Sequence, residues 1–346
     1  MTDTKPAKAG KARALVCAAI SAGAALGAAV LVAGQLAPGS YFGGRTVDLR
    51  HLLGLGLVTC GALFAFLRAP WRSGLAISLG VFACAPGWFL AVASPRPAAA
   101  IPGATKVPDL RIGSANLLFG IAHPDPLGEW IDSEDLDVLA LQEVLDSDRS
   151  KLNWPKILRT WEKRFPHQWV IEHDFFGMAL LSRIPFERIS SAALDAPDSL
   201  EHGRPMRLDA RLDWGGGTRV VVVHPPRPGK DWRMPERERF FAELGADLAA
   251  DPDGLAMGEP LIVLGDFNAT GASPLFRSLL GRVGLADSRL GFGRQPSWTH
   301  DHLPDWFGLR LLCLDHILLR GPAAIERAVG PAIRSDHAPV HAVLTW

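Results

Sequence analysis

A long apolar run near the start of the sequence restricts the possible folds more than any other feature. It spans residues 14–37, and its only polar side chains are Ser21 and Gln35. About 20 consecutive apolar residues are enough for a helix to cross the hydrocarbon core of a bilayer. The run therefore predicts a transmembrane helix.

Two further apolar runs, at residues 52–67 and 74–93, predict a second and a third transmembrane helix. The second run is short, and the third contains Pro86-Gly87, which membrane helices tolerate when neighbouring segments satisfy the freed backbone groups. A cleaved signal peptide is the alternative explanation of the first run. We favour a retained helix, because the run is long and no clear cleavage site follows it. We expect residues 1–93 to form a membrane anchor of three helices.

The basic residues between these runs predict the orientation of the anchor. Four Lys and Arg residues precede the first run, and Arg68 and Arg72 lie between the second and the third. Loops rich in Lys and Arg tend to remain on the cytoplasmic side of a membrane. Three crossings would then place everything after residue 93 on the extracytoplasmic side of the inner membrane. Arg45 and Arg50, in the loop 38–51, oppose this orientation without reversing it.

Proline content and charge predict where the anchor ends. Residues 94–108 contain four prolines and show neither helical nor strand periodicity, so we expect a semi-rigid linker at 94–106. Only two of the 36 Asp and Glu residues precede residue 107, against ten of the 36 Lys and Arg residues. The remainder, residues 107–346, is therefore acidic, and we expect it to form a separate domain.

Short apolar runs alternate with helical patterns in this acidic part, which is typical of α/β domains. The segment DWGGGT predicts a Gly-rich hairpin turn between two strands. Hairpins combined with helical connections favour mixed sheets that carry helices on their outer faces. We expect strands at 110–114, 138–141, 168–171, 178–182, 207–212, 220–223, 261–264, 314–319 and 339–344, and helices near 155–165 and 235–249.

The segment LIVLGDFNAT, at residues 261–270, places a carboxylate and a carboxamide where a buried strand ends. Because side chains alternate along a strand, Asp266 and Asn268 are expected on one face and Phe267 on the other. Gly265 would permit a bulge or a close approach of the backbone. By itself the segment is typical of an ordinary turn. Polar residues recur, however, at other predicted strand ends: Asn116, Glu143, His224, Asp315, Asp336 and His337. Their recurrence predicts one active-site cleft.

The types of these residues favour metal-assisted chemistry on phosphate. Carboxylates with Asn and without thiolates suit a hard cation such as Mg²⁺ or Mn²⁺. Histidines with acidic neighbours suit contacts with phosphate or proton transfer near neutral pH. Zinc is the second choice, because the sequence has no HExxH motif, and a Ser-His-Asp hydrolase is disfavoured by the absence of GxSxG. The four cysteines form no CxxC, so neither a disulfide framework nor a thiolate zinc site is expected.

Residues 107–346 resemble the endonuclease/exonuclease/phosphatase superfamily in the order of seven segments: SANL, LALQEV, GMALLSR, VVVVHP, VLGDFNAT, LDHILL and SDHAPV. The resemblance implies an α/β fold, a four-layer α/β/β/α sandwich with two mixed sheets. It also implies a divalent-metal site at one edge of the sheets. The hydrophobic front third is not part of the superfamily core and is similar to the anchors of membrane-bound bacterial members.

The resemblance implies that most of these residues serve the metal and the attacking water. Glu143 would be the main ligand of Mg²⁺ or Mn²⁺, with Asn116 and Asp336 beside or behind it. Asp266 would align or deprotonate the water, and Asn268 would hold a non-bridging phosphate oxygen.

The same resemblance assigns the histidines to the phosphate. His337 would contact it and be held by Asp315, which would fix the tautomer of the ring and favour its charged form. His224 would act on the phosphate or leaving-group side. Either Asp266 or His337 could accept the proton of the water.

The motifs shared across the family leave the substrate open among nucleic acids, phospholipids and sugar phosphates. The acidic balance of residues 107–346 counts against tight binding of duplex DNA, to which phosphate contacts contribute much of the affinity. A domain tethered at the outer face of a membrane favours a phospholipid, and extracellular nucleic acid is the other option. The alternative function is a catalytically inactive membrane scaffold, which we disfavour because every expected polar position is filled.

Overall fold

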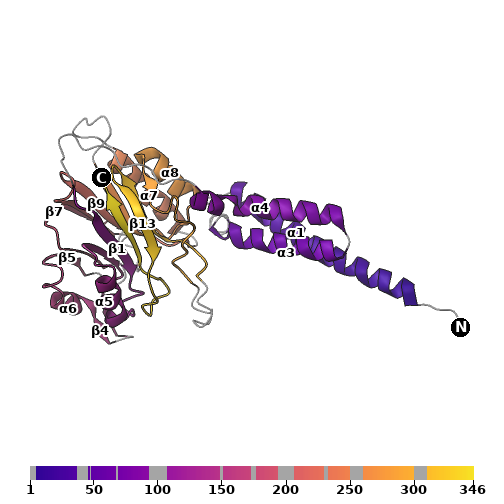
Figure 1. Ribbon diagram of the computed structural model, residues 1–346, viewed down its shortest axis with the longest axis horizontal. Coiled ribbons are helices and arrows are strands. Elements are labelled where there is room, and N and C mark those ends of the chain that lie inside the picture. The colour runs from indigo at the N-terminus through magenta and orange to yellow at the C-terminus, as the bar shows by residue number, and fades with distance from the viewer. Residues whose placement is uncertain are drawn as a thin grey trace. The chain divides into compact units, whose positions relative to one another are not determined.

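The computed structural model describes residues 5–36, 46, 48–67, 69–92, 107–148, 151–172, 177–193, 206–229, 233–249, 260–299 and 310–346. The chain forms two compact units, Met1–Phe89 and Leu90–Trp346 (Figure 1). The linker predicted at 94–106 lies outside the described residues.

The first unit is helical. Its helices are α1 (Lys5–Leu36), α3 (Arg50–Phe66) and most of α4 (Pro70–Val92). Among the described helices, one segment, Ala12–Ala33 within α1, is long and apolar enough to cross a membrane, and a signal sequence or the core helix of a soluble protein meets the same criterion. The apolar helix α3 has 17 residues and falls short of that length. The structure therefore supports one of the three predicted membrane helices by length and composition, and not the multi-pass anchor.

The second unit contains two six-stranded mixed sheets. The first sheet has the order β13-β14-β1-β2-β6-β5, and the second has the order β11-β12-β10-β9-β8-β7. The strands of the first sheet are β1 (Leu110–Asn116), β2 (Val138–Gln142), β5 (His167–Ile171), β6 (Met178–Ser182), β13 (Ala323–Val329) and β14 (Val340–Thr345). Those of the second are β7 (Phe186–Ala193), β8 (Met206–Leu212), β9 (Thr218–His224), β10 (Leu261–Asp266), β11 (Ala286–Asp287) and β12 (Asp315–Arg320). A small hairpin, β3 (Asp146–Ser147) with β4 (Leu152–Asn153), lies outside both sheets.

The two sheets share one pattern of strand pairing. In each, the third and fourth strands of the order are parallel, β1 with β2 and β10 with β9. The remaining neighbours within each sheet are antiparallel. Because β1 and β2 are parallel, their carboxyl ends meet at the same edge of the first sheet. The same holds for β9 and β10 in the second sheet, so each sheet presents a pair of neighbouring strand ends.

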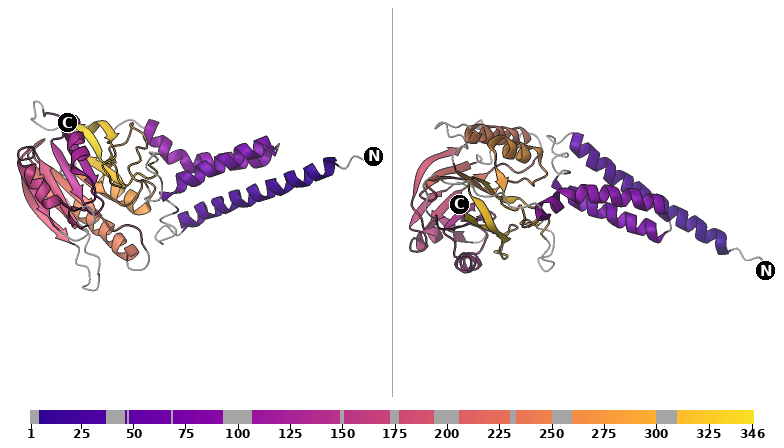
Figure 2. Two further views of the ribbon diagram at one scale, coloured as in Figure 1. Left: turned by 90° about the horizontal axis from the view of Figure 1, so that it is seen from below. Right: turned by 45° about the horizontal axis from the view of Figure 1, so that its top comes forward.

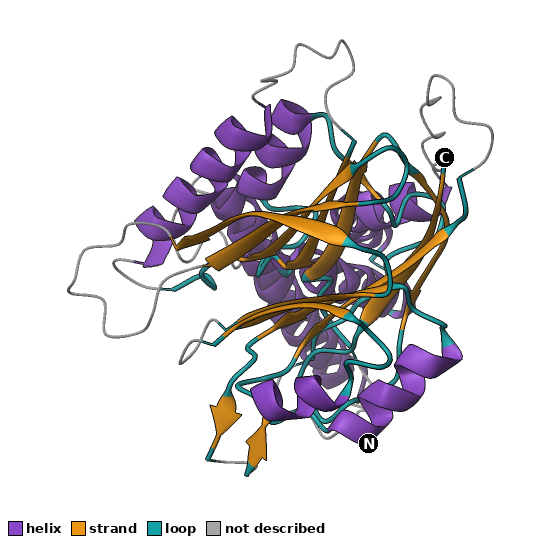
Figure 3. Cartoon of the chain, turned by 90° about the vertical axis from the view of Figure 1, so that its left-hand side faces the viewer, coloured by secondary structure: helices purple, strands orange, loops and turns teal. Residues whose placement is uncertain are grey.

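Helices cover the outer faces of the sheets. Helices α5 (Pro124–Ser133) and α6 (Trp154–Thr160) pack on the first sheet through a cluster that includes Leu127, Trp130 and Leu158. Helices α7 (Arg233–Ala249) and α8 (Pro274–Val283) cover the outer face of the second sheet (Figures 2 and 3). Phe240 and Phe276 are among the side chains buried beneath them. A third buried cluster fills the space between the two sheets. These layers confirm the predicted α/β/β/α sandwich with two mixed sheets.

Most of the predicted elements are present, with shifted ends. The apolar run 220–223, for example, lies within β9, and all four of its valines are fully buried. Seven described elements of the second unit were missed: the two-residue strands β3, β4 and β11, the longer strands β7 and β13, and the helices α5 and α8. Helix α8 starts after Ser273 with Pro274 in its first turn and ends at Gly284, whose φ of 73° is the left-handed conformation that terminates many helices.

Candidate active site

The predicted site residues lie at strand ends of both sheets. Asn116 ends β1 and Glu143 follows β2 in the first sheet, whereas His224 ends β9 and Asp266 ends β10 in the second. The other four are Asn268, two residues after β10, Asp315, which starts β12, and Asp336 with His337, which precede β14. The contacts described below bring these residues into one cluster, as expected from the sequence.

One carboxamide joins the two sheets. The Nδ2 atom of Asn116 donates hydrogen bonds to Oε1 of Glu143 and to Oδ2 of Asp266, each over 3.0 Å. Its Oδ1 accepts a hydrogen bond from the backbone N–H of Leu118, which fixes the orientation of the amide. The amide of Asn116 therefore holds the carboxylates of Glu143 and Asp266 next to each other, although the two residues come from different sheets.

Glu143 has an unusual backbone for a residue with a side chain. Its φ of 59° lies in the left-handed region, which non-glycine residues adopt rarely and which is concentrated at functional sites. Its Oε2 accepts a hydrogen bond of 2.6 Å from the backbone N–H of Phe119. Burial raises the pKa of Glu143, against the opposing effect of its hydrogen bond with Asn116. The buried carboxylate of Glu143 would therefore be stabilised by a positive charge next to it.

Gly265 allows the backbone to bring Asp266 into this position. Its φ is 141°, and a Cβ at this residue would lie 2.1 Å from the carbonyl oxygen of Val223. The predicted close approach of the backbone is therefore confirmed. A side chain at residue 265 would force β9 and β10 apart next to the candidate site.

The prediction that Asp266 and Asn268 lie on one face of a continuing strand was wrong. Strand β10 ends at Asp266, and Asn268 has a φ of 48°, so the two residues do not continue one strand. Instead, Oδ1 of Asp266 accepts a hydrogen bond of 2.7 Å from the backbone N–H of Asn268, the contact of an Asx turn. Nδ2 of Asn268 donates to the carbonyl oxygen of Pro225 over 3.2 Å. An amide nitrogen carries two hydrogens, so this bond leaves the second for a ligand.

His337 and Asp315 form a hydrogen-bonded pair. Nδ1 of His337 donates to Oδ2 of Asp315 over 2.8 Å, and the same oxygen accepts a hydrogen bond of 2.6 Å from Oγ of Ser297. Nε2 of His337 lies 3.6 Å from Oδ2 of Asp266. Burial, which favours the neutral ring, is outweighed by the charges of Asp315 and Asp266, so the pKa of His337 is raised well above its usual value. The two neighbouring carboxylates therefore favour the charged form of His337.

His224 is in the opposite protonation state. Its Nε2 lies 3.6 Å from Oε1 of Glu143 and 3.6 Å from Oδ2 of Asp266. Burial lowers the pKa of His224, and the charge of Asp266 opposes this effect without cancelling it. Nε2 of His224 and Nε2 of His337 thus lie at the same distance, 3.6 Å, from Oδ2 of Asp266.

Asp336 offers a free acceptor to the site. Its Oδ2 accepts a hydrogen bond of 2.9 Å from Nε1 of Trp298, whereas its buried Oδ1 makes no hydrogen bond with the described residues. Its negative charge raises the pKa of Glu143. A buried carboxylate oxygen without a donor is suited to a cation.

A family comparison covers the whole of this site. The model of the Endonuclease/Exonuclease/phosphatase family matches residues 113–337, which include all eight predicted site residues. The chain belongs to this family. No curated protein sequence matches the chain. Members of the family are hydrolases of phosphate esters, so the chain has the fold of a phosphoesterase.

Solved structures of the family resemble the chain over its second unit. A family protein from Bacteroides thetaiotaomicron is similar with a TM-score of 0.50 and 15% identity, over 69% of this chain and 98% of that one. One from Beutenbergia cavernae has a TM-score of 0.49 and 21% identity, over 68% and 71%. A mannosyl-6-phosphatase from Bacteroides thetaiotaomicron has a TM-score of 0.49 and 14% identity, over 68% and 100%. At these identities the similarity concerns the fold alone.

The donor set of this family member fits a divalent cation. Glu143 and Asp266 present oxygen atoms that share one Asn116 amide, and Asp336 adds the acceptor without a partner. Asp266, Asp315 and His337 also have potential ligand atoms within 4.8 Å of one another. In that group, however, Nδ1 of His337 already donates to Asp315. The carboxylates of Glu143, Asp266 and Asp336, here called the oxygen cluster around Glu143, have the all-oxygen chemistry that Mg²⁺ and Mn²⁺ prefer.

Two groups that support the site were not recognised in the sequence. Ser297 accepts hydrogen bonds from the backbone N–H groups of Leu314 and Asp315 while its hydroxyl donates to the carboxylate of Asp315. Ser335 donates to the carbonyl oxygen of Asn116, and its Oγ accepts the backbone N–H of His337. Neither serine belongs to a pattern that separates it from an ordinary loop serine, although Ser335 directly precedes the predicted Asp336.

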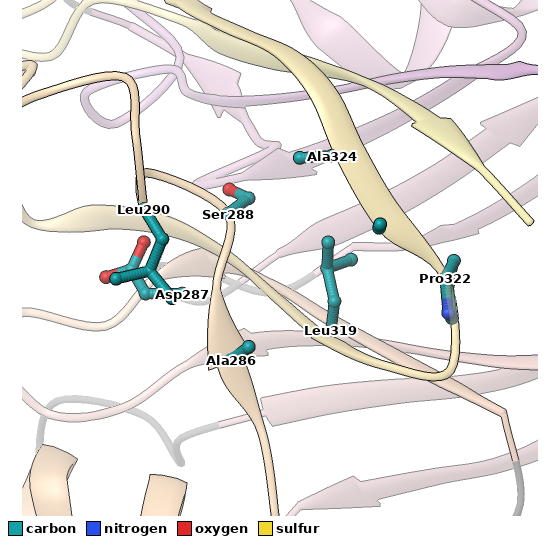
Figure 4. A pocket seen from close by; sticks show the side chains of 8 residues that line it. Ala286, Asp287, Ser288, Leu290, Leu319, Pro322 and Ala324 are labelled. Atoms are coloured by element: carbon teal, nitrogen blue, oxygen red, sulfur yellow. The ribbon is translucent and has the colours of Figure 1, made fainter. Parts of the chain in front are cut away.

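A small pocket lies apart from this cluster, where β11, β12 and the start of β13 meet. Its lining residues are Ala286, Asp287, Ser288, Leu290, Leu319, Pro322, Ala323 and Ala324 (Figure 4). Its one charged side chain, Asp287, is bound by the guanidinium of Arg289, with the closest atoms 2.6 Å apart. The pocket therefore presents no reactive group, and we place the chemistry at the cluster around Asp266.

Proposed function

We propose that this chain is a membrane-anchored phosphoesterase that uses Mg²⁺ or Mn²⁺ and hydrolyses its substrate by attack of a water molecule. The observation that carries this proposal is the Asn116 amide, which holds Glu143 and Asp266 together between a charged His337 and a neutral His224. Phosphoryl transfer needs groups that are positioned in advance and that balance the negative charge of the phosphate. This arrangement provides both.

Glu143 is the proposed main ligand of the cation, with Asn116 and Asp336 beside or behind it. A bound divalent cation would supply a Lewis acid for the phosphate oxygens and lower the pKa of the attacking water. The raised pKa of Glu143 and the buried acceptor of Asp336 support this assignment, because both side chains need positive charge nearby.

Asp266 is the proposed general base. Burial raises its pKa, with the charge of His337 acting in the opposite direction, and a carboxylate with a raised pKa is a stronger proton acceptor. Nδ1 of His337 is hydrogen-bonded to Asp315, and the charged form of the ring carries a hydrogen on both nitrogens. In that form His337 has no lone pair with which to accept a proton. We infer that His337 instead stabilises the negative charge that develops on the phosphate, and that Asp315 holds it in place.

His224 and Asn268 are the proposed contacts of the substrate. The neutral ring of His224, beside Glu143 and Asp266, can donate one hydrogen bond to the phosphate or to the leaving group. The second amide hydrogen of Asn268, which Pro225 does not take, can bind a non-bridging oxygen.

The proposed substrate is a phosphodiester or a phosphomonoester in a lipid, a sugar phosphate or a nucleic acid. The acidic charge of residues 107–346 disfavours tight non-specific binding of duplex DNA, which depends on contacts with phosphates. The proposed anchor would place the domain at the outer leaflet, where phospholipid headgroups are the nearest phosphate esters.

The experiment is a hydrolysis panel with the full chain in detergent, supplied with Mg²⁺ or Mn²⁺. The substrates are single-stranded DNA, duplex DNA, inositol phosphates and phospholipids. Asp266→Asn should lower the turnover number about 10²–10⁴-fold, which is the usual contribution of a general base. Glu143→Gln is expected to be inactive. Asp132→Asn and Glu187→Gln, which change exposed carboxylates elsewhere, are the matched controls.

Full activity of the Glu143→Gln and Asp266→Asn variants, or turnover that persists in a chelator, would refute the proposed chemistry. A folded chain that binds neither Mg²⁺ nor Mn²⁺ and hydrolyses no phosphate ester would instead support an inactive membrane scaffold.

The orientation of the domain has its own test. We propose a three-helix anchor, with residues 94–106 as an extracytoplasmic linker, because the basic residues before the first apolar run favour the cytoplasmic side. Protease added to intact spheroplasts should then cleave near Thr105. Full protection of the chain would place the domain in the cytoplasm.

A further inference from the structure

A second cluster of potential ligands lies on the outer face of the first sheet. It combines His341 of β14, Glu326 of β13 and Glu134, the residue that caps the C-terminus of α5. None of these residues takes part in the candidate active site. The cluster therefore joins one helix to two strands at a place that the proposed chemistry does not use.

The imidazole of His341 is the central group of this cluster. Its side chain is 4% exposed, and neither ring nitrogen makes a hydrogen bond with the described residues. Its Nε2 nevertheless lies 3.2 Å from Oε2 of Glu134 and 3.6 Å from Oε1 of Glu326. A buried polar side chain without a hydrogen bond is uncommon in folded proteins and calls for a ligand.

These separations match the coordination sphere of a small transition-metal ion. Ligand atoms at about 2.0–2.2 Å from a tetrahedral Zn²⁺ are roughly 3.4 Å apart. The two distances from Nε2 lie on either side of that value, and the three ligand atoms are within 4.8 Å of one another. The side chain of Glu326 is 53% exposed, so water could complete the coordination.

The charges around the cluster favour a cation. The C-terminal end of α5 carries a partial negative charge, and the helix has no basic residue in its last turn. The neighbouring Arg111 donates to the backbone oxygen of Glu134, which leaves the carboxylate of Glu134 to the cluster. Arg327 directs its guanidinium to Ser288, Gln295 and backbone oxygens instead.

We propose that Glu134, Glu326 and His341 form a second metal site, for a transition-metal ion such as Zn²⁺ or Mn²⁺. One imidazole and two carboxylates are a ligand set of such ions, whereas Mg²⁺ prefers oxygen ligands alone. A bound ion ties α5 to the β13–β14 edge of the sheet. Its role is structural, because none of the three residues touches the proposed catalytic groups.

The test is metal binding by the full chain in detergent. Excess Mg²⁺ occupies the oxygen cluster around Glu143, and the chain is then titrated with Co²⁺, whose visible absorption is strong in a four-coordinate site and weak in an octahedral one. We expect one equivalent of Co²⁺ to bind, and Zn²⁺ to displace it. Glu326→Gln and Glu134→Gln should weaken binding at least about tenfold, the lower range for the loss of a group that supports a metal ligand. Both side chains are partly exposed, so these variants should fold.

Two controls separate this site from the catalytic one. Glu143→Gln should leave Co²⁺ binding unchanged even though it removes hydrolysis, and Glu187→Gln should change neither. Thermal unfolding checks that every variant is folded, without reference to activity. Absence of Co²⁺ binding in the presence of excess Mg²⁺ would overturn the proposal, and so would an unchanged affinity in both the Glu326→Gln and Glu134→Gln variants. In those cases the cluster is an ion pair of His341 with Glu134 and Glu326 and holds no metal ion.

Discussion

Replacing Asp315 by Asn should move the alkaline limit of activity to lower pH. The carboxylate of Asp315 holds Nδ1 of His337 over 2.8 Å and is one of the main charges that raise the pKa of that ring. A hydrogen bond to a charged partner contributes about 1.5–3 kcal/mol. Loss of that contribution should lower the pKa of His337. Asp266 and Asp336 still favour the charged ring, so the loss is partial.

The direction of the effect follows from the protonation state of His337. A group whose pKa is raised in the folded state stabilises the fold fully below its unfolded pKa, which is about 6.5 for histidine. That stabilisation, and the charge available to the phosphate, are lost as the pH rises through the folded pKa. The variant should therefore lose both at a lower pH than the unchanged chain.

The assay is kcat/KM against pH with a chromogenic phosphodiester, alongside thermal unfolding over the same pH range. Ser297→Ala is the matched control, because it removes a neutral hydrogen bond of 2.6 Å to the same oxygen of Asp315 and keeps the charge. It should not move the alkaline limit downward. A folded Asp315→Asn variant with an unmoved alkaline limit would refute the inferred role of the charged His337.

Three further predictions concern the fold and the cation. Gly265→Ala should destabilise the domain by about 1–3 kcal/mol, because residue 265 has a positive φ and its Cβ would meet the backbone of Val223. Gly281→Ala, whose Cβ would meet no atom within 4 Å, should not destabilise it. Denaturant unfolding measures both variants. Arg289→Met should cost about 3–5 kcal/mol in the same assay, because it removes the guanidinium from the buried carboxylate of Asp287 and leaves that carboxylate with the His316 ring at 3.5 Å; adding Asp287→Asn should recover part of that loss. Removal of divalent cations by a chelator should abolish hydrolysis, and added Mg²⁺ or Mn²⁺ should restore it; turnover that survives the chelator would contradict the metal-dependent mechanism.

The regular strands were predictable from the sequence because their burial leaves a clear pattern. The run 220–223 is buried on both faces and therefore appears as four consecutive valines. Strands β7 and β13 were missed because each contains an irregularity, between Arg188 and Ser190 and between Ala324 and Glu326. A bulge breaks the alternation of apolar and polar residues on which a strand prediction depends.

That the predicted residues lie together could be expected from their positions at strand ends, but their supporting contacts could not. Arg289 and Arg327 are buried, yet nothing in the sequence separates them from arginines on the surface. Arg289 is buried because Asp287 accepts its hydrogen bonds, a pairing that only the folded chain reveals. The turn at Asn268 was misjudged for a related reason: the alternation rule applies only while the strand continues, and β10 ends at Asp266.

The position of β14 has a consequence for the order in which the catalytic apparatus becomes functional. This strand follows every other strand in the sequence, yet it lies inside its sheet, between β13 and β1. His337 precedes it by three residues, and β1, its neighbour, carries Asn116. A nascent chain that has not yet delivered β14 would leave β1 without one partner and lack His337 altogether. Hydrolytic competence should therefore be acquired in a single late step, after translation has passed residue 345.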